Sequence, residues 1–230
     1  MGSLYLLRHG QASFGQTDYD ALSPQGQEQA RILGQALQQR GIRFHRALQG
    51  SMLRHQQTAK FCLAEMADAP PLQTDERWNE FDHQAIMKAL HPDFENPEQV
   101  QAFLKSSKDP ARAFHKEFEK AMQRWMSGTR DEDYTETWQQ FKQRCADALQ
   151  SLLKTADPSE NILVFTSGGP ISGLMGQSLE LSDAAILRLN GAIVNASITR
   201  LPFKEHQLFV AFFNDYAHFE KTSSSLLTHR

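Results

Sequence analysis

The sequence predicts an α/β protein, a three-layer α/β/α sandwich with a mostly parallel central sheet and a helical insertion. Short apolar runs at residues 3–7 and 162–166 each end in a polar, glycine-containing turn, as strands buried in a parallel sheet do. Segments with helical apolar spacing alternate with such runs, which is typical of layered α/β folds. Residues 83–157 differ, because they are rich in Gln, Lys, Glu, Phe and Trp and poor in β-branched runs. We therefore expect one domain over residues 1–230, with a helical cap or lid at 83–157.

Capping and breaking residues delimit the elements of the first half. Ser23 and Pro24 suit the N-cap and the first position of a helix. A short strand is expected at residues 46–49. After it, Ser51 is expected to cap a second helix that runs to about residue 69, where two consecutive prolines follow.

The insertion contains one apolar stripe, and strands return after it. Between residues 114 and 125, apolar residues fall at i, i+4, i+7, i+8 and i+11, which favours a helix face turned to a core. The alternative is a lid face that lines a substrate pocket. Beyond the strand at 162–166 we expect a helix from residue 171 and two closing strands, near 192–201 and 207–213.

Composition excludes several classes of function. The 24 basic and 27 acidic residues give a net charge of −3 without a long run of either sign, so no nucleic-acid partner is expected. No apolar stretch approaches the roughly 20 residues of a spanning helix, so we expect no membrane partner and a cytoplasmic protein. Cys62 and Cys145 lack the spacing of a zinc or redox motif and are expected to be buried thiols. The oligomeric state is left open.

Four separate segments place polar or glycine residues just after a strand or at the start of a helix, where an open α/β sheet gathers its ligand groups. Phosphoryl transfer requires a nucleophile, cations for the spreading negative charge, and an acid for the leaving oxygen. His9 can attack phosphorus. Arg8 and Arg54 can hold phosphate oxygens, and Glu80 can donate the proton. These residue types predict a site for a small phosphorylated substrate or inorganic phosphate, without a metal or cofactor.

Several neighbours of these residues are further candidates. Gly10 permits close backbone approach, and the amides of Gly168 and Gly169 can form an anion nest at a helix start. Asp82 is an alternative to Glu80 as the acid. Other histidines, His55 among them, are expected to be ordinary surface or satisfied core residues. The remaining candidates are Gln11 and Ser13, which either contact the phosphate or are solvent-exposed, and His83, which either supplies an imidazole or merely starts a helix.

The segment LLRHGQASFGQTDYDALSPQGQEQARILG resembles the opening signature of the histidine phosphatase superfamily, also called phosphoglycerate mutase-like. Three further segments resemble that family in the expected order: SMLRHQQTA for the second arginine, RWNEF for the catalytic acid and VFTSGGPI for a second histidine. FNDYAHF is similar to its closing strand. The resemblance implies that His9 becomes phosphohistidine, that Arg8 and Arg54 hold the phosphate and that Glu80 is the proton donor.

One position departs from the family pattern. Where the family usually has serine-histidine-glycine-glycine, this chain has Thr166-Ser167-Gly168-Gly169, so that Ser167 stands in the place of the second histidine. A serine hydroxyl can bond a phosphate oxygen but cannot carry an imidazolium charge. Loss of a charged donor costs roughly 2 to 4 kcal/mol in a transition state, so we expect turnover to be lower by about two to three decades than in a relative with the histidine, unless another group compensates.

Three functions remain open. The first is a phosphomonoesterase that acts through phosphohistidine on His9. The second is a catalytically weak or inactive protein that binds a phosphate ligand, which Ser167 favours. The third is a sugar-phosphate mutase, but the mutase branch continues with glutamate-serine-x-tryptophan-asparagine, whereas this chain reads QASFG at residues 11–15. Substrate choice is expected to depend on residues 83–157.

Overall fold

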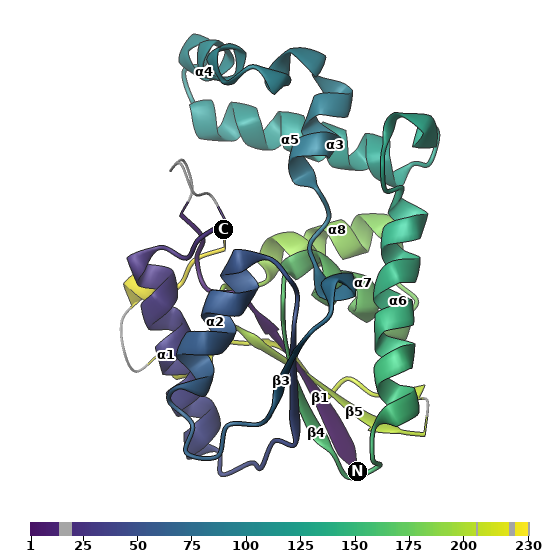
Figure 1. The fold of residues 1–230 in the computed structure, drawn as a ribbon. Helices are drawn as coiled ribbons and strands as arrows, with labels where there is room; N and C mark the ends of the chain where they lie inside the picture. Colours follow the sequence, from purple (N-terminus) through teal and green to yellow (C-terminus); the bar gives the residue numbers. More distant parts are fainter. Residues whose placement is uncertain (14–19, 206, 221–223, 230) are drawn as a thin grey trace. The chain divides into compact units, whose positions relative to one another are not determined.

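The computed structural model describes residues 1–13, 20–205, 207–220 and 224–229 (Figure 1). The chain forms two compact units. The first consists of Met1–Glu80 and Cys145–Arg230, and the second of Phe81–Arg144. The predicted α/β class is confirmed. The role of residues 83–157 as a cap or lid stays a prediction.

The first unit contains a seven-stranded sheet in the order β3-β2-β4-β1-β5-β6, with β7 paired to β5. Strands β3, β2, β4 and β1 pair in parallel, whereas β5 pairs antiparallel with β1, β6 and β7. Their bounds are β1 Gly2–Arg8, β2 Arg46–Gln49, β3 Leu72–Thr74, β4 Asn161–Thr166, β5 Ile198–Lys204, β6 Gln207–Leu208 and β7 Phe212–Asp215.

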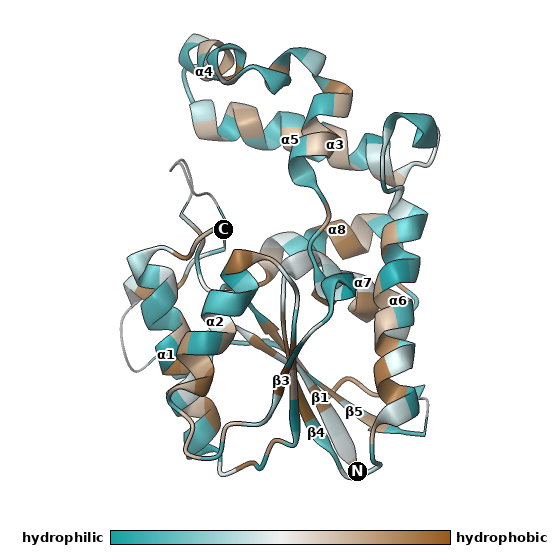
Figure 2. Ribbon diagram, viewed as in Figure 1, coloured by the Kyte–Doolittle hydropathy of each residue, from teal (hydrophilic) through white to brown (hydrophobic). Residues whose placement is uncertain are grey.

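Helices cover both faces of this sheet, which is why β1 is buried along its whole length. Figure 1 shows α1 (Pro24–Gln39) and α2 (Leu53–Leu63) on one side and α7 (Gly168–Ser178) on the other. α8 (Asp183–Ala192) follows α7 and packs against it. Figure 2 shows the apolar residues concentrated in the strands and on the helix faces that meet them. One continuous core cluster joins Tyr5 and Leu7 of β1 to Leu33 and Leu37 of α1.

The register of the parallel strands aligns three carboxyl ends at one edge. Arg8 of β1 lies beside Thr166 of β4, and Gln49 of β2 lies beside Phe165. The residues that follow these strands are therefore neighbours in space. This edge is where an open α/β sheet binds its ligands.

The start of α1 is as predicted, whereas the start and end of α2 are not. Ser23 is the N-cap of α1, and its hydroxyl accepts from the Gly26 amide at 3.0 Å. Ser51 does not cap α2, because its hydroxyl accepts instead from the Asn79 side chain at 2.8 Å. The Asp20 carboxylate serves the helix start, accepting from the Leu53 amide at 2.6 Å. α2 ends at Leu63, short of residue 69.

The expected strand at residues 192–201 is also corrected. Ala192 ends α8, and β5 begins only at Ile198. The intervening residues 193–197 are buried, as those of a strand would be, but the chain turns sharply at Ala196, where φ is 56°. The run 207–213 is divided between β6 and β7. The three exposed residues of β3 had no apolar signal in the sequence.

The second unit is helical. It contains α3 (His83–Leu90), α4 (Pro97–Ser106) and α5 (Pro110–Met126), and α6 (Trp138–Thr155) begins in it. The apolar stripe lies on α5. Its first two residues are half-buried, and the last three are buried. Trp125 packs edge-on against Trp138, with ring centroids 5.2 Å apart.

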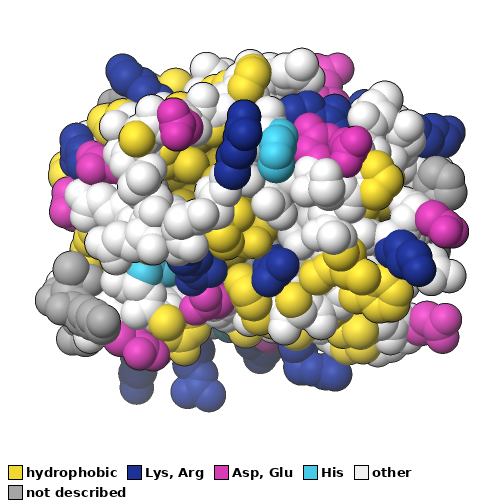
Figure 3. All heavy atoms as spheres, turned by 90° about the horizontal axis from the view of Figure 1, so that it is seen from below, with side chains coloured by type: hydrophobic (Ala, Val, Ile, Leu, Met, Phe, Trp, Pro, Cys, Tyr) yellow, Lys and Arg dark blue, Asp and Glu magenta, His cyan; other side chains and the backbone are white. Residues whose placement is uncertain are grey.

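Two surface properties bear on partners. None of the described helices has the length and apolar character that a membrane span requires. Figure 3 shows basic and acidic side chains interspersed over the face seen from below.

Candidate active site

The site begins where β1 ends. His9 follows β1 directly, and its amide donates to the Thr166 carbonyl at 2.9 Å, next to the point where Ser167 leaves β4. The Gly50 amide donates to the Phe165 carbonyl at 3.1 Å, which fixes the chain just before α2. Arg54 therefore enters the same edge from the first turn of α2.

The His9 imidazole is held in a defined orientation. Its Nδ1 lies 2.7 Å from the Gly10 carbonyl oxygen, and only a protonated Nδ1 can donate to that acceptor. In the neutral ring, the lone pair is then on Nε2. The carbonyl of His9 is fixed as well, because it accepts from the Asn195 side chain at 3.1 Å and from the Ala196 amide at 3.2 Å.

Burial and neighbouring positive charges disfavour the protonated form of this imidazole. Burial, followed by the positive charges of Arg54 and Arg8, holds the pKa of His9 well below its usual range, despite the bond to Gly10. The side chain is only 6 % exposed. A neutral ring with a free lone pair is the nucleophilic form of histidine.

Both predicted arginines are buried beside His9. The Arg8 guanidinium donates to the carbonyls of Ile193 and His229, the latter at 3.2 Å. The Arg54 Nη1 donates to the Asp20 carboxylate at 2.6 Å. Within the described part of the chain, the buried Arg54 Nε has no hydrogen-bond partner. Arg54 thus retains a donor for a bound anion.

Glu80 lies against the turn that follows β4. Its Oε2 accepts from the Gly169 amide at 3.0 Å, so this amide is occupied by a carboxylate rather than open as part of an anion nest. The segment before Glu80 is fixed by the Thr166 hydroxyl, which donates to the Trp78 carbonyl at 2.6 Å.

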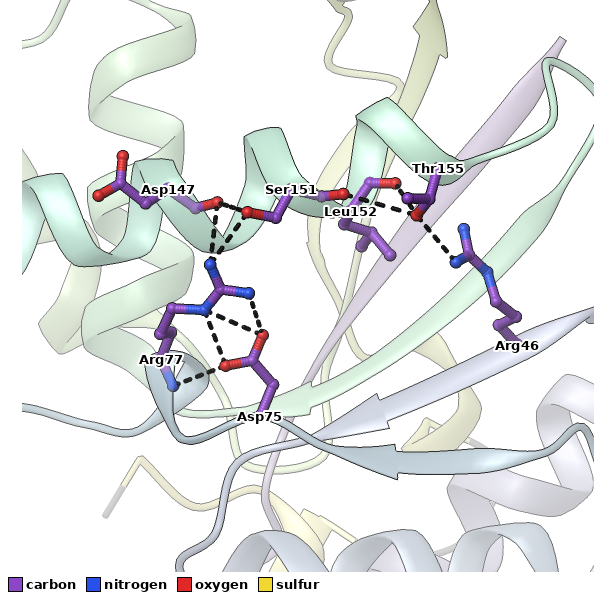
Figure 4. Close-up of polar contacts among 7 residues, drawn as sticks. All are labelled: Arg46, Asp75, Arg77, Asp147, Ser151, Leu152 and Thr155. Atoms are coloured by element: carbon purple, nitrogen blue, oxygen red, sulfur yellow. Dashed lines mark hydrogen bonds and ion pairs between the residues drawn. The ribbon is translucent and has the colours of Figure 1, made fainter.

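A second set of bonds holds the same segment to α6 (Figure 4). Arg77 pairs with Asp75, with Nη2 and Oδ2 2.7 Å apart, and its Nη1 donates to Ser151 at 3.0 Å. The hydrogen bonds of Arg77 lower the pKa of the Asp75 carboxyl. The segment that precedes Glu80 is therefore fixed by hydrogen bonds to both β4 and α6.

Gly10 has a packing role in the structure. A Cβ atom at this position would lie 2.3 Å from the Gly26 carbonyl oxygen, so only glycine permits this approach to α1. Its amide donates to the Thr58 hydroxyl at 3.1 Å.

Gln11 and Ser13 are engaged within the first loop. The Ser23 hydroxyl donates to the Gln11 side chain at 2.9 Å, and the Ser13 amide donates to Ala21 at 2.8 Å. Contact of either residue with a phosphate stays a prediction. Phe14 and Gly15, which entered the comparison with the mutase branch, lie outside the described residues.

Asp82 and His83 belong to the second unit. The Asp82 carboxylate caps α3 by accepting from the Gln84 and Ala85 amides at 3.0 Å. This capping role gives Asp82 a structural task. The alternatives stated for His83 stay predictions.

Sequence reasoning missed one histidine of the site. His55 is fully buried, and its Nε2 lies 2.7 Å from the Ser167 hydroxyl oxygen. Its ring centroid is 5.7 Å from that of His9. Ser167 precedes α7 at the N-cap position, but its side chain makes no capping bond. The available signal was the position of His55 directly after Arg54 in SMLRHQQTA.

Ligands for a metal ion are not grouped among the described residues, where no cluster of three or more His, Cys, Asp or Glu side chains could hold one. Cys62 and Cys145 are free and buried. Burial raises the pKa of the Cys62 thiol, which suits an inert core residue.

A protein-family model matches most of the chain. The model of the histidine phosphatase superfamily (branch 1) matches residues 4–127 and 105–216. A comparison with curated proteins gave no match.

Three solved structures illustrate the likeness in fold. YhfR from Bacillus stearothermophilus has 19 % identity and a TM-score of 0.66, with 95 % of this chain and 99 % of that chain covered. A phosphoglycerate mutase from Bacillus anthracis has 19 % identity and a TM-score of 0.66, with 95 % of each chain covered. A mycobacterial glucosyl-3-phosphoglycerate phosphatase in complex with inorganic phosphate has 20 % identity and a TM-score of 0.60, with 94 % and 98 % covered.

Proposed function

The chain belongs to branch 1 of the histidine phosphatase superfamily, and we propose that it hydrolyses phosphomonoesters through a phosphohistidine on His9. The observation that carries this proposal is the state of the His9 ring. Burial and then the charges of two arginines lower its pKa, so that the ring is neutral, and its Nδ1 donates to the Gly10 carbonyl. The lone pair on Nε2 is thereby available for attack on phosphorus.

The first step forms the covalent intermediate. His9 Nε2 attacks phosphorus, a P–N bond forms, and the P–O bond to the leaving group breaks. Arg8 and Arg54 offset the negative charge on the phosphoryl oxygens. Glu80, in its protonated form, gives its proton to the leaving oxygen and becomes a carboxylate.

The second step returns the enzyme to its starting state. Water attacks phosphorus, the P–N bond breaks, and the Glu80 carboxylate takes the proton that the water loses. The products are inorganic phosphate and a neutral His9. The Gly169 amide lies 3.0 Å from the Glu80 carboxylate oxygen, and this bond to the segment after β4 supports the role proposed for Glu80.

The substrate is a small phosphate ester, and we propose that residues 83–157 choose among such esters. Transfer of the phosphoryl group to a second sugar-phosphate hydroxyl instead of water would make the protein a mutase. Addition of candidate acceptors to the assay, with detection of the phosphorylated acceptor, separates the two reactions.

Ser167 favours one further candidate, a protein that binds a phosphate ligand with little turnover. It stands where the resemblance implies a histidine. Calorimetry separates this candidate from the first, because a binding protein takes up inorganic phosphate but does not release phosphate from an ester.

The test of the proposed function is hydrolysis of p-nitrophenyl phosphate by the wild type and by His9→Ala. We expect the variant to lose about 10³-fold or more of kcat, because no other group supplies the nucleophile. Rapid quenching of the wild type should trap an acid-labile phosphate on His9. His45→Gln is the control, since this exposed histidine is bonded to Asn161 away from the site. Undiminished activity of His9→Ala would exclude the mechanism.

A further inference from the structure

The Ser167 hydroxyl has a buried partner in α2. Its oxygen lies 2.7 Å from His55 Nε2, and both side chains are 0 % exposed. The two residues are 112 positions apart in the sequence and meet because β2 and β4 are adjacent strands. An imidazole is therefore present at this point of the site, although it comes from α2 rather than from the turn after β4.

The space for this imidazole is built into the backbone. A Cβ atom on Gly50 would lie 2.2 Å from His55 Nδ1, so the glycine leaves room for the ring. Nδ1 has no hydrogen-bond partner among the described residues. The hydrogen bond of His55 that the structure does define is directed at Ser167. Burying an imidazole with one ring nitrogen unbonded costs free energy. This cost points to a functional reason for the contact with Ser167.

We propose that His55 is a positioning residue that orients the Ser167 hydroxyl toward the phosphoryl group. The pair thereby replaces the single histidine that the resemblance implies at position 167. This inference rests on the proposed function. Ser167 makes the contact with the substrate, and His55 acts through Ser167.

The direction of the hydrogen bonds follows from the number of protons. A serine hydroxyl has one proton, and the oxygens of a phosphate dianion only accept. Ser167 must therefore donate its proton to the phosphate, and its oxygen must accept from a protonated His55 Nε2. In the free protein, burial and the charge of Arg54 hold the pKa of His55 well below its usual range, so that the ring is neutral. The negative charge of a bound phosphate dianion acts against the charge of Arg54 and favours the protonated form of the ring.

The geometry also explains why Ser167→His alone, with His55 still present, would not reproduce the function proposed for the pair. The Ser167 oxygen is already in hydrogen-bond contact with His55 Nε2, and both residues are fully buried. A second imidazole at 167 would overlap the first. The histidine can be moved to 167 only if the ring at 55 is removed.

A double-mutant cycle tests the inference with kcat and KM for p-nitrophenyl phosphate. The variants are His55→Leu, which keeps volume but cannot donate, Ser167→Ala, and the two combined. We expect each single variant to lower kcat by about 10- to 100-fold with KM changed by less than about threefold. The combined variant should be no slower than the slower single variant, because His55 has no effect without the hydroxyl.

Two further variants separate positioning from mere packing. His55→Gln retains an amide donor and should keep kcat within about fivefold of the wild type. His55→Ala/Ser167→His moves the imidazole to the turn after β4 and should restore kcat at least to the wild-type value, whereas His55→Ala alone should not. Thermal unfolding of each variant shows that it is folded. If His55→Leu does not fold, the test is the kcat of His55→Ala/Ser167→His relative to the wild type.

The outcomes distinguish this inference from the proposed function. If the wild type is active and depends on His9, multiplicative losses in the combined variant overturn the inference alone. The same holds if His55→Gln is as slow as His55→Leu, or if the moved histidine restores nothing. If the wild type neither hydrolyses the ester nor forms phosphohistidine, the proposed function fails, and the inference fails with it.

Discussion

At the scale of single residues, Gly10 shows how closely the loop after β1 packs against α1. A methyl group there would lie 2.3 Å from the Gly26 carbonyl oxygen and within 3.0 Å of two more Gly26 backbone atoms. Since backbone on both sides must shift, we expect Gly10→Ala to lower the free energy of unfolding by roughly 1 to 3 kcal/mol. Urea unfolding at neutral pH measures this loss.

Gly191 provides the matched control. It lies in α8, and a Cβ atom there would have no heavy atom of the described residues within 4 Å apart from its chain neighbours and the backbone of its own helix. Gly191→Ala should leave the free energy of unfolding unchanged or raise it by up to about 1 kcal/mol, because alanine favours a helix. Equal losses in both variants would show that close packing is not the reason for glycine at position 10.

The residue types of the site could be predicted from the sequence, whereas one of its contacts could not. His9 directly follows β1, Arg54 lies in the first turn of α2, and Glu80 belongs to the segment between β3 and α3, so the parallel strands bring these segments to one edge. The bond between His55 and Ser167 depends on the strand order, in which β4 enters between β1 and β2. The spacing of residues in the sequence does not reveal this strand order. The sequence therefore gave no reason to place His55 in the site.

At the scale of secondary-structure elements, the start of α1 depends on Ser23. Its hydroxyl accepts from the Gly26 amide and donates to Gln11, so it joins the helix to the loop that follows His9. We expect Ser23→Ala to cost about 1 kcal/mol of the free energy of unfolding. Ser23→Asn can make both bonds and should retain most of it. Chemical unfolding of the two variants checks this, and equal stability would contradict the capping role.

Elements that depend on remote side chains were the ones misjudged. α2 starts at Leu53 because the Asp20 carboxylate accepts from the Leu53 amide, and Ser51 is held by Asn79 instead. Neither partner is near in sequence. The apolar residues before β5 predict a strand from 192, whereas the chain forms a buried loop there, in which Ala196 adopts a left-handed conformation. Local patterns thus identified burial correctly but not the path of the backbone.

At the scale of the whole molecule, three histidines link stability to pH. The pKa values of His9 and His55 are held well below their usual range, mainly by burial. Burial lowers the pKa of His218 to about 4, although Asp215 opposes the shift. All three rings are neutral in the folded protein at neutral pH. In the unfolded chain each takes up a proton near pH 6.5.

The sign of the pH dependence follows from these protons. Because the unfolded chain binds more protons below about pH 6.5, the free energy of unfolding should be greatest above that pH and fall as the pH is lowered. Each histidine contributes a slope of up to about 1.4 kcal/mol per pH unit, and for His218 the fall should continue to about pH 4. The lowered pKa of Asp215 keeps that carboxylate charged between pH 7.5 and 5.5, so it adds no slope there.

Urea unfolding at these two pH values should show a less stable protein at pH 5.5 and a smaller difference in His218→Gln, whose amide can still reach the Ala196 carbonyl. Equal stability at both pH values, or an unchanged difference in the variant, would contradict this account, since a buried neutral imidazole must cost free energy when the solution favours its charged form.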